Sequence, residues 1–116
     1  MDKKNKLRKN VDFLRVYKNG KSYGNRNLVL YVLKNGLDYS RFGFSVSKKI
    51  GNSVVRNKVK RRLKEIVRKS LYNIENGYDI ILIPKKSVID LEFNILEESV
   101  YHILKVSGLF KEFGDK

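Results

Sequence analysis

The chain has 116 residues, of which 41% are apolar, one is proline and none is cysteine, and its formal net charge is +14. This length fits a single domain that buries about two thirds of its unfolded surface, and the lack of cysteine excludes disulfides, thiolate zinc sites and a cysteine nucleophile. No apolar run approaches the roughly 20 residues that span a bilayer, and no hydrophobic region follows the charged start, so we expect a soluble, unexported, cytoplasmic protein.

The positive charge lies in the first two thirds of the chain. Residues 1–75 hold 21 Lys and Arg against 5 Asp and Glu, whereas residues 76–116 hold 5 against 7. Such a polarised cation is typical of proteins that bind nucleic acid. Residues 1–9 carry five basic residues and one acid without an apolar period, which predicts a flexible basic arm.

A helix is predicted after the arm. Asn10 suits an N-cap, Asp12 suits the positive end of the helix dipole, and Gly20 suits the helix end. Phe13 and Tyr17 are four residues apart and therefore lie on one face. On spacing alone, a core-facing aromatic pair is the preferred interpretation of these two rings.

Two strands are predicted next, over residues 28–33 and 41–47, and we expect them to form a hairpin through the loop 35–40. The second alternates between two faces, with Phe42, Phe44 and Val46 toward a core. Gly43 and Ser45 on the other face would leave a groove, which Tyr31 of the neighbouring strand could line. An ordinary solvated sheet face explains the same alternation equally well.

A basic amphipathic helix is predicted from Gly51 to Lys69, capped by Asn52 or Ser53. Its apolar positions are Val55, Val59, Leu63, Ile66 and Val67. Its opposite faces carry Asn57, Lys60, Arg61, Lys64 and Arg68 in one row, with Arg56, Lys58 and Arg62 beside it. Solvated faces usually mix charge signs, but eight of the fourteen residues from 56 to 69 are basic and only Glu65 is acidic. A phosphate backbone is the natural partner, because each neutralised phosphate releases counterions. A membrane surface fits less well, since the apolar stripe is narrow and has no aromatic anchors.

The rest of the chain is predicted to complete one domain. The turn before the basic helix contains no phosphate-binding glycine motif. Residues 78–83 read as a strand buried on both faces, followed by a turn at 84–87. Asp90 is predicted to cap a last helix that ends near Gly108. Its core positions are Phe93, Leu96, Val100, Ile103 and Leu104. The tail 109–116 contains Leu109, Phe110 and Phe113, which could pack back on the domain.

The sequence contains no residue set of the kind that a nuclease active site needs. Its single histidine, His102, falls among core positions of the last helix, which favours a structural or surface role. Glu92, Glu97 and Glu98 read as the solvated face of the same helix. Hydrolysis by this chain itself is therefore not expected, because it needs a carboxylate metal cluster or a histidine acid/base pair.

The run Arg56-Asn57-Lys58-Val59-Lys60-Arg61-Arg62-Leu63-Lys64-Glu65 is similar to the signature helix of the bacterial ribonuclease P protein subunit. The stretch from Gly43 to Asn52 also resembles the strand and turn that precede this helix in the family. Further family-like positions are Leu7, Lys9, Asp12, Phe13, Tyr17, Leu30 and Tyr31. The likeness runs from about residue 7 to residue 104. Lys85 stands where the family often has Arg, and Pro84 precedes it instead of following it, so the resemblance assigns no RNA contact to this turn.

The resemblance implies an α+β fold, an α/β sandwich with a mixed sheet of about four strands and three helices in the order α-β-β-α-β-α. It also implies a left-handed β-α-β crossover through the basic helix, an exception to the usual hand. Residues implied to contact the catalytic RNA are Arg56, Asn57, Lys60, Arg61, Lys64 and Arg68. Residues implied to hold the single-stranded 5′ leader of precursor tRNA are Lys9, Phe13, Tyr17, Tyr31, Ser45 and Lys48. This role favours a stacking function for Phe13 and Tyr17 over the core interpretation.

The implied function is that of an accessory subunit. The ribonuclease P RNA and its bound Mg²⁺ would cleave precursor tRNA at the mature 5′ end, while the protein would screen phosphates and hold the leader. No metal site on the protein itself is expected. The alternative is a ribosomal or general RNA-binding protein that uses the same basic helix without a leader groove.

Overall fold

The computed structural model describes residues 1–111, and within that range it has a mixed four-stranded sheet and three α-helices. The strands are β1 (Lys21–Gly24), β2 (Leu28–Lys34), β3 (Arg41–Phe44) and β4 (Tyr78–Pro84). The helices are α1 (Asn10–Asn19), α2 (Ser53–Ser70) and α3 (Phe93–Val106). Short 3-10 turns occur at η1 (Lys3–Asn5), η2 (Lys48–Ile50), η3 (Leu71–Asn73) and η4 (Lys86–Asp90). The predicted α+β sandwich is therefore confirmed. The predicted order of elements had three strands, and the structure adds β1 as a fourth.

The sheet order is β1-β2-β4-β3, and this corrects the predicted hairpin. β2 pairs antiparallel with both β1 and β4, whereas β3 pairs parallel with β4. β4 takes the central place because it is apolar along both faces: Ile80 and Leu82 enter one core, and Ile81 enters the other. The partner of β2 in the hairpin is β1. Helix α2 forms the crossover between the parallel strands β3 and β4.

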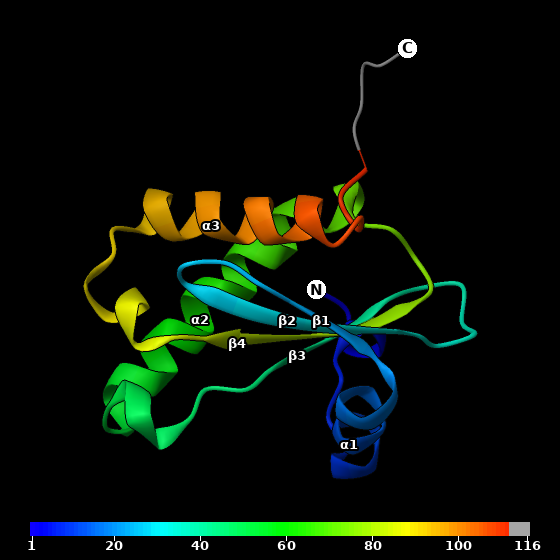
Figure 1. Ribbon diagram of the computed structural model, residues 1–116, viewed down its shortest axis with the longest axis horizontal. Helices are drawn as coiled ribbons and strands as arrows, with labels where there is room; N and C mark the ends of the chain where they lie inside the picture. The colour runs from blue at the N-terminus through cyan, green and yellow to red at the C-terminus, as the bar shows by residue number, and fades with distance from the viewer. Residues whose placement is uncertain (112–116) are drawn as a thin grey trace.

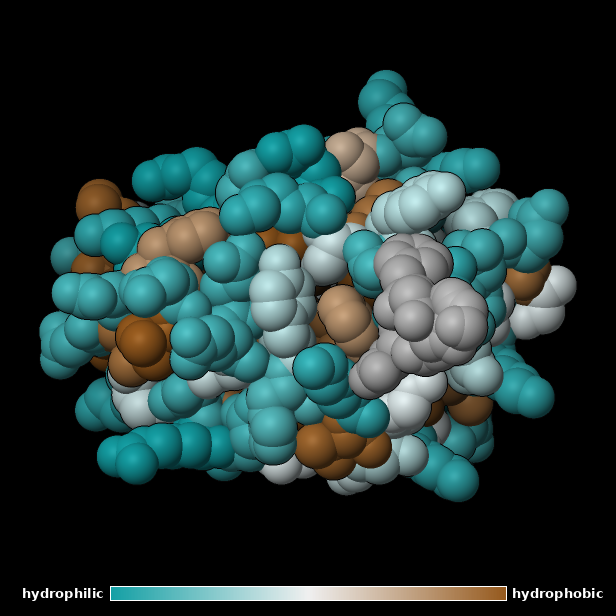
Figure 2. All heavy atoms as spheres, turned by 90° about the horizontal axis from the view of Figure 1, so that it is seen from above, coloured by the Kyte–Doolittle hydropathy of each residue, from teal (hydrophilic) through white to brown (hydrophobic). Residues whose placement is uncertain are grey.

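The helices cover the two faces of the sheet unequally (Figure 1). Helix α1 lies alone on one face, where Val16 packs with Leu7 and Ile81. Helices α2 and α3 lie on the other face and enclose the larger core, which includes Phe42, Leu63 and Val100. Seen from the α3 side, the surface is mostly hydrophilic with small separated apolar patches (Figure 2).

Helix α2 forms as predicted. Asn52 is its N-cap, and the Asn52 side-chain oxygen accepts a hydrogen bond from the Val55 backbone N–H at 3.0 Å. The buried side of the helix consists of Val59, Leu63, Ile66, Val67 and Ser70. Burial of four aliphatic side chains fixes the rotation of the helix, which leaves its basic residues on the outer faces.

Two other predicted caps are wrong. Asn10 is the first residue of α1, and the N-cap position belongs to Lys9, which makes no side-chain cap bond. Asp90 ends η4, so α3 begins after Glu92, again without a side-chain cap. The end of α1 at Gly20 and the core stripe of α3 agree with the prediction.

The predicted free arm is also wrong for its second half. The Asn5 side-chain amide donates to the Ser40 carbonyl at 2.8 Å, and Lys6 bridges to Phe42 in parallel. Leu7 is buried, and its N–H donates to the Phe42 carbonyl at 2.9 Å. Leu7 is a single buried apolar residue, so residues 1–9 have no apolar period from which this contact with the domain could be predicted.

The start of the predicted tail packs on the domain. Leu109 is buried, and Phe110 bridges to Ile74. Phe113 lies outside the described residues.

Candidate nucleic-acid interface

Helix α2 carries all six of the residues expected to contact the catalytic RNA. Asn57, Arg61, Lys64 and Arg68 are exposed, and Arg56 and Lys60 are half-buried. The nearby acid Glu65 is already paired, since both guanidinium nitrogens of Arg68 that face it donate to its carboxylate, at 2.6 and 3.1 Å. This hydrogen bonding lowers the pKa of Glu65. Within α2, no ion pair joins Lys60, Arg61 or Lys64 to Glu65, whose partner is Arg68.

Arg62 has a different role from its neighbours. Its guanidinium donates to the Leu91 carbonyl at 3.1 Å, which ties α2 to the segment between η4 and α3. Lys69 likewise pairs with Glu97 of α3 at 2.9 Å. These two basic residues hold the helices together and are not part of the outward row.

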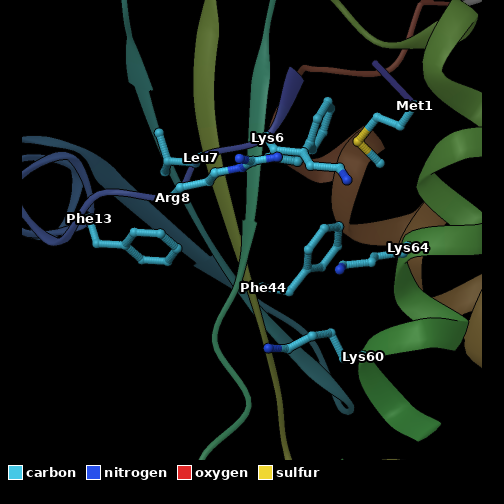
Figure 3. Close-up of a pocket in the computed structure, with 9 residues that line it drawn as sticks. Met1, Lys6, Leu7, Arg8, Phe13, Phe44, Lys60 and Lys64 are labelled. Atoms are coloured by element: carbon cyan, nitrogen blue, oxygen red, sulfur yellow. The ribbon is translucent and has the colours of Figure 1, made fainter. Parts of the chain in front are cut away.

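A cationic pocket lies between α2, β3 and the N-terminal arm (Figure 3). Its volume is about 410 Å³, and none of its lining residues is acidic. The lining residues are Met1, Lys6, Leu7, Arg8, Phe13, Phe42, Phe44, Lys60 and Lys64. Lys6 and Arg8 extend from the N-terminal arm on one side of Phe44, and Lys60 and Lys64 extend from α2 on the other (Figure 3).

The electrostatics of the cationic pocket favour an anion. Partial burial lowers the pKa of Lys64, and the charges of Lys6, Lys60 and Arg8 lower it further. Converging like charges raise the energy of the free protein, and a phosphate placed between them would remove that repulsion. The pocket is therefore suited to a phosphate group.

An aromatic groove adjoins the cationic pocket on the α1 side of the sheet. It is a cavity of about 510 Å³ lined by Arg8, Asn10, Phe13, Leu14, Tyr17, Phe44 and Ser45. The Phe13 ring lies directly over Gly43, where an added Cβ would overlap Phe13 Cζ and come within 2.9 Å of Phe13 Cε2. Glycine at this position thus creates the space that the ring occupies.

The rings of the aromatic groove support one another. The centroids of Phe13 and Tyr17 are 6.4 Å apart, and Tyr31 meets Tyr17 edge to face at 5.0 Å. Tyr31 of β2 thus packs against Tyr17 and supports the Tyr17 ring from the side of the sheet. Such an edge-to-face pair is a favourable aromatic geometry, which fixes Tyr17 in place.

Of the six residues expected to hold a leader, the structure brings four together: Phe13, Tyr17 and Ser45 line the aromatic groove, and Tyr31 supports it. Lys9 and Lys48 are exposed at the start of α1 and in η2, and neither lines the groove.

Sequence reasoning missed Arg8 and Phe44, which line both cavities together with Phe13. Arg8 gave no signal beyond its charge. Phe44 packs against the larger core, as its alternation predicts, but it ends an edge strand and is only half-buried, so it also lines both cavities. The two cavities therefore share walls and form one basic and aromatic surface.

A buried ion-pair cluster anchors α1 on the sheet. Asp79 of β4 is fully buried and accepts from Arg41 at 2.7 and 2.8 Å, from Asn35 at 3.0 Å and from Arg15 of α1 at 3.2 Å. Burial alone would raise the pKa of Asp79, but these hydrogen bonds and the charge of Arg41 outweigh it, so the pKa is lowered. Arg15 pairs with Asp12 as well, at 3.1 Å. The cluster fixes the helix that supplies Phe13 and Tyr17.

Within residues 1–111, no three His, Asp or Glu side chains gather in a way that could hold a metal ion. His102 is exposed on α3, and its Nδ1 lies 3.2 Å from the Asn25 side-chain nitrogen. In the same described range, no helix is long and apolar enough to cross a membrane.

Comparison with known proteins identifies the family. The family model described as Ribonuclease P matches residues 1–107. The ribonuclease P protein component of Clostridium botulinum strain Langeland is 47% identical over 109 residues, which cover 93% of this chain and 98% of that protein. The corresponding protein of Caldanaerobacter subterraneus is 45% identical over 111 residues, 96% of each chain.

Solved structures agree with this match. The RNase P protein of Staphylococcus aureus superposes with a TM-score of 0.86 at 39% identity, over 92% of this chain and 98% of that chain. The RNase P protein of Thermotoga maritima gives a TM-score of 0.82 at 39% identity, over 87% and 96% of the two chains. With sequence, fold and basic helix in agreement, the chain belongs to the ribonuclease P protein family.

Proposed function

We propose that this chain binds the catalytic RNA of ribonuclease P and the 5′ leader of precursor tRNA, and so assists removal of the leader. The observation that carries this proposal is the junction of the cationic pocket with the aromatic groove. Four cations without an acid suit phosphates, and aromatic faces beside them suit unpaired bases. A single-stranded nucleic acid offers both groups at each nucleotide.

The outer face of α2 is the proposed contact with the catalytic RNA. Arg61, Lys64 and Asn57 are exposed along one row, and a guanidinium can bind a phosphate with two parallel hydrogen bonds. The double substitution of Lys60 and Arg61 by Ala should weaken assembly with the RNA. The slope of log affinity against log salt should fall by about 0.9 for each lost phosphate contact. An unchanged slope would remove these residues from the RNA contact.

The aromatic groove is the proposed contact with the leader. Base stacking on an aromatic side chain contributes roughly 1 to 3 kcal/mol per base and tolerates any sequence, as a leader of variable sequence requires. Ser45 adds a hydroxyl to the groove, and Arg8 adds a cation shared with the cationic pocket. Lys9 and Lys48 are proposed to reach the leader beyond the groove.

The chemistry is proposed to belong to the RNA. Mg²⁺ held by the RNA would supply hydrolysis, and the side chains of residues 1–111 do not form a cluster suited to that ion. The protein would lower phosphate repulsion and orient the leader in this cytoplasmic reaction.

The first experiment is cleavage of a precursor tRNA by a bacterial ribonuclease P RNA at low Mg²⁺, with and without the full chain. We expect activity only when both are present, and none from the protein alone. Protein that binds the RNA without aiding cleavage would support a general RNA-binding role, and cleavage by protein alone would overturn the accessory role.

The groove has its own test against the general RNA-binding alternative. Phe13→Ala and Tyr17→Ala should reduce the preference of the holoenzyme for precursor over mature tRNA while leaving assembly with the RNA intact. Equal loss for all RNAs would instead favour the general RNA-binding protein.

A further inference from the structure

Lys64 is the basic residue of the cationic pocket on which the other three charges of that pocket act. It is exposed on α2 and extends toward Phe44 (Figure 3). Partial burial lowers the pKa of its amine, and the positive charges of Lys6, Lys60 and Arg8 lower it further. A larger share of this amine is therefore uncharged at neutral pH than in an isolated lysine, and only the uncharged amine is a nucleophile.

The cationic pocket combines two kinds of wall around the Lys64 amine. Lys6, Arg8 and Lys60 supply cations for a phosphate, and none of the residues that line the pocket is acidic. The ring of Phe44 and other apolar side chains lie beside these cations. Inorganic phosphate uses only the charged wall, whereas a phosphate that carries a small acyl group also uses the apolar wall. The pocket therefore suits an acyl phosphate, the mixed anhydride of a carboxylic acid and phosphoric acid.

We propose that Lys64 is a modification site, at which an acyl phosphate binds in the cationic pocket and transfers its acyl group to the Lys64 amine. The ammonium first loses one proton to water. The amine nitrogen then attacks the carbonyl carbon, an N–C bond forms, and the C–O bond to phosphate breaks with its electron pair on the phosphate oxygen. A second proton passes from the nitrogen to the departing phosphate. The products are an acyl-lysine and inorganic phosphate, and nothing is oxidised or reduced.

Acylation replaces a cation of α2 by a neutral amide. The consequence for RNA rests on the proposed function, in which Lys64 contacts phosphates of the catalytic RNA. Acylated protein then has one phosphate contact fewer, so its salt slope should fall by about 0.9. RNA that is already bound covers the amine, so assembly and acylation of Lys64 oppose one another.

The test treats the full chain with acetyl phosphate and measures the acetylation of each lysine by tandem mass spectrometry. Lys58 is the internal control, because it is exposed on α2 and does not line the pocket. Acetic anhydride is the matched reagent, since it delivers the same acetyl group without a phosphate. A cleft lined by charges of one sign raises the local concentration of counter-ions by roughly 10- to 1,000-fold. The ratio of Lys64 to Lys58 acetylation should therefore be at least about tenfold higher with acetyl phosphate than with acetic anhydride.

Competition by an unreactive anion tests whether the pocket guides the reagent. Inorganic phosphate should lower the ratio obtained with acetyl phosphate more than chloride does at the same ionic strength, because phosphate occupies the pocket and chloride mainly screens charge. Equal ratios with the two reagents would overturn the proposal, as would equal effects of the two salts. Acetylation of Lys6 or Lys60 ahead of Lys64 would also overturn it.

Assembly with a bacterial ribonuclease P RNA transcript separates this inference from the proposed function. Acetyl phosphate should weaken assembly of the wild type more than that of Lys64→Arg, each compared with its own untreated protein, because arginine stays charged. Selective acetylation of Lys64 without loss of assembly would support the modification site and remove Lys64 from the RNA contact. Unselective acetylation, together with weakened assembly by Arg61→Ala, would overturn the modification site and leave the role of α2 standing.

Discussion

Gly43 offers a direct test of the proposed leader contact in the aromatic groove, because its missing side chain makes room for Phe13. In Gly43→Ala, the new Cβ would lie 2.9 and 3.2 Å from Phe13 Cε2 and Cε1, with Cζ closer still. Carbon atoms ordinarily pack at about 3.5–4.0 Å, so the ring must move by roughly 1 Å. The ring borders an open groove and can swing, which places the expected loss of stability near the lower end of the range for overpacking, about 1–2 kcal/mol.

Gly43→Ala should impair the recognition of precursor tRNA more than it destabilises the fold. With Phe13 displaced, preference for precursor over mature tRNA should fall about as far as in Phe13→Ala, which competition binding with the reconstituted holoenzyme measures. In a Phe13→Ala background, Gly43→Ala should cost little further stability, since the clashing ring is gone. Gly24→Ala is the control, because its Cβ would approach no atom closer than 3.9 Å. Wild-type precursor preference in Gly43→Ala would refute the placement of Phe13 as a leader contact.

Three further substitutions test the scaffold by urea unfolding. Asp79→Asn should lose about 2–4 kcal/mol of unfolding free energy at neutral pH, because Arg41 and Arg15 lose a buried anion. The difference in stability between wild type and variant should shrink as the pH falls below about 4. The pKa of Asp79 is lower in the folded than in the unfolded protein, so the wild type loses this stabilisation on acidification through the folded-state pKa. A constant deficit down to pH 2 would contradict this linkage. Asn52→Ala should cost about 1 kcal/mol and Ser53→Ala much less, because only the Asn52 side chain caps α2; equal costs would reject the cap. Gly20→Ala should cost about 3 kcal/mol, since its Cβ would meet the backbone oxygens of Val32 and Val16 at 2.6 and 2.7 Å and backbone moves less easily than a ring; a loss no larger than that of Gly24→Ala would contradict it.

Local patterns in the sequence predict the elements that bury a regular stripe. Helix α2 has a cap, a three- and four-residue apolar period and a charged opposite face, and all three features appear in the structure. Strand β4 is apolar from Ile80 to Ile83 and is buried on both faces. In each case one segment alone contains the pattern needed for the prediction, because the spacing of its apolar residues matches the spacing of its buried positions.

Features that depend on distant partners could not be predicted in this way. β1 is four residues long, with one half-buried side chain, so it has no alternation to detect. The parallel partner of β3 lies beyond α2, and adjacency along the chain favoured β2 instead. Arg8 and Phe44 contribute to both cavities only because the arm returns beside β3. The ion pairs of Asp79 join three separate elements and leave no local trace.

The bridge from Lys6 to Phe42 has a consequence for the behaviour of the protein without RNA. β3 is one of the two outer strands, and an outer strand with free N–H and C=O groups is a template for pairing between molecules. Because Lys6 and Leu7 occupy part of that edge, the N-terminal segment hinders the addition of a strand from another molecule and so opposes aggregation. The same short segment brings Lys6 and Arg8 to the cationic pocket, so one stretch of chain both covers part of the sheet edge and supplies two cations to the proposed RNA contact.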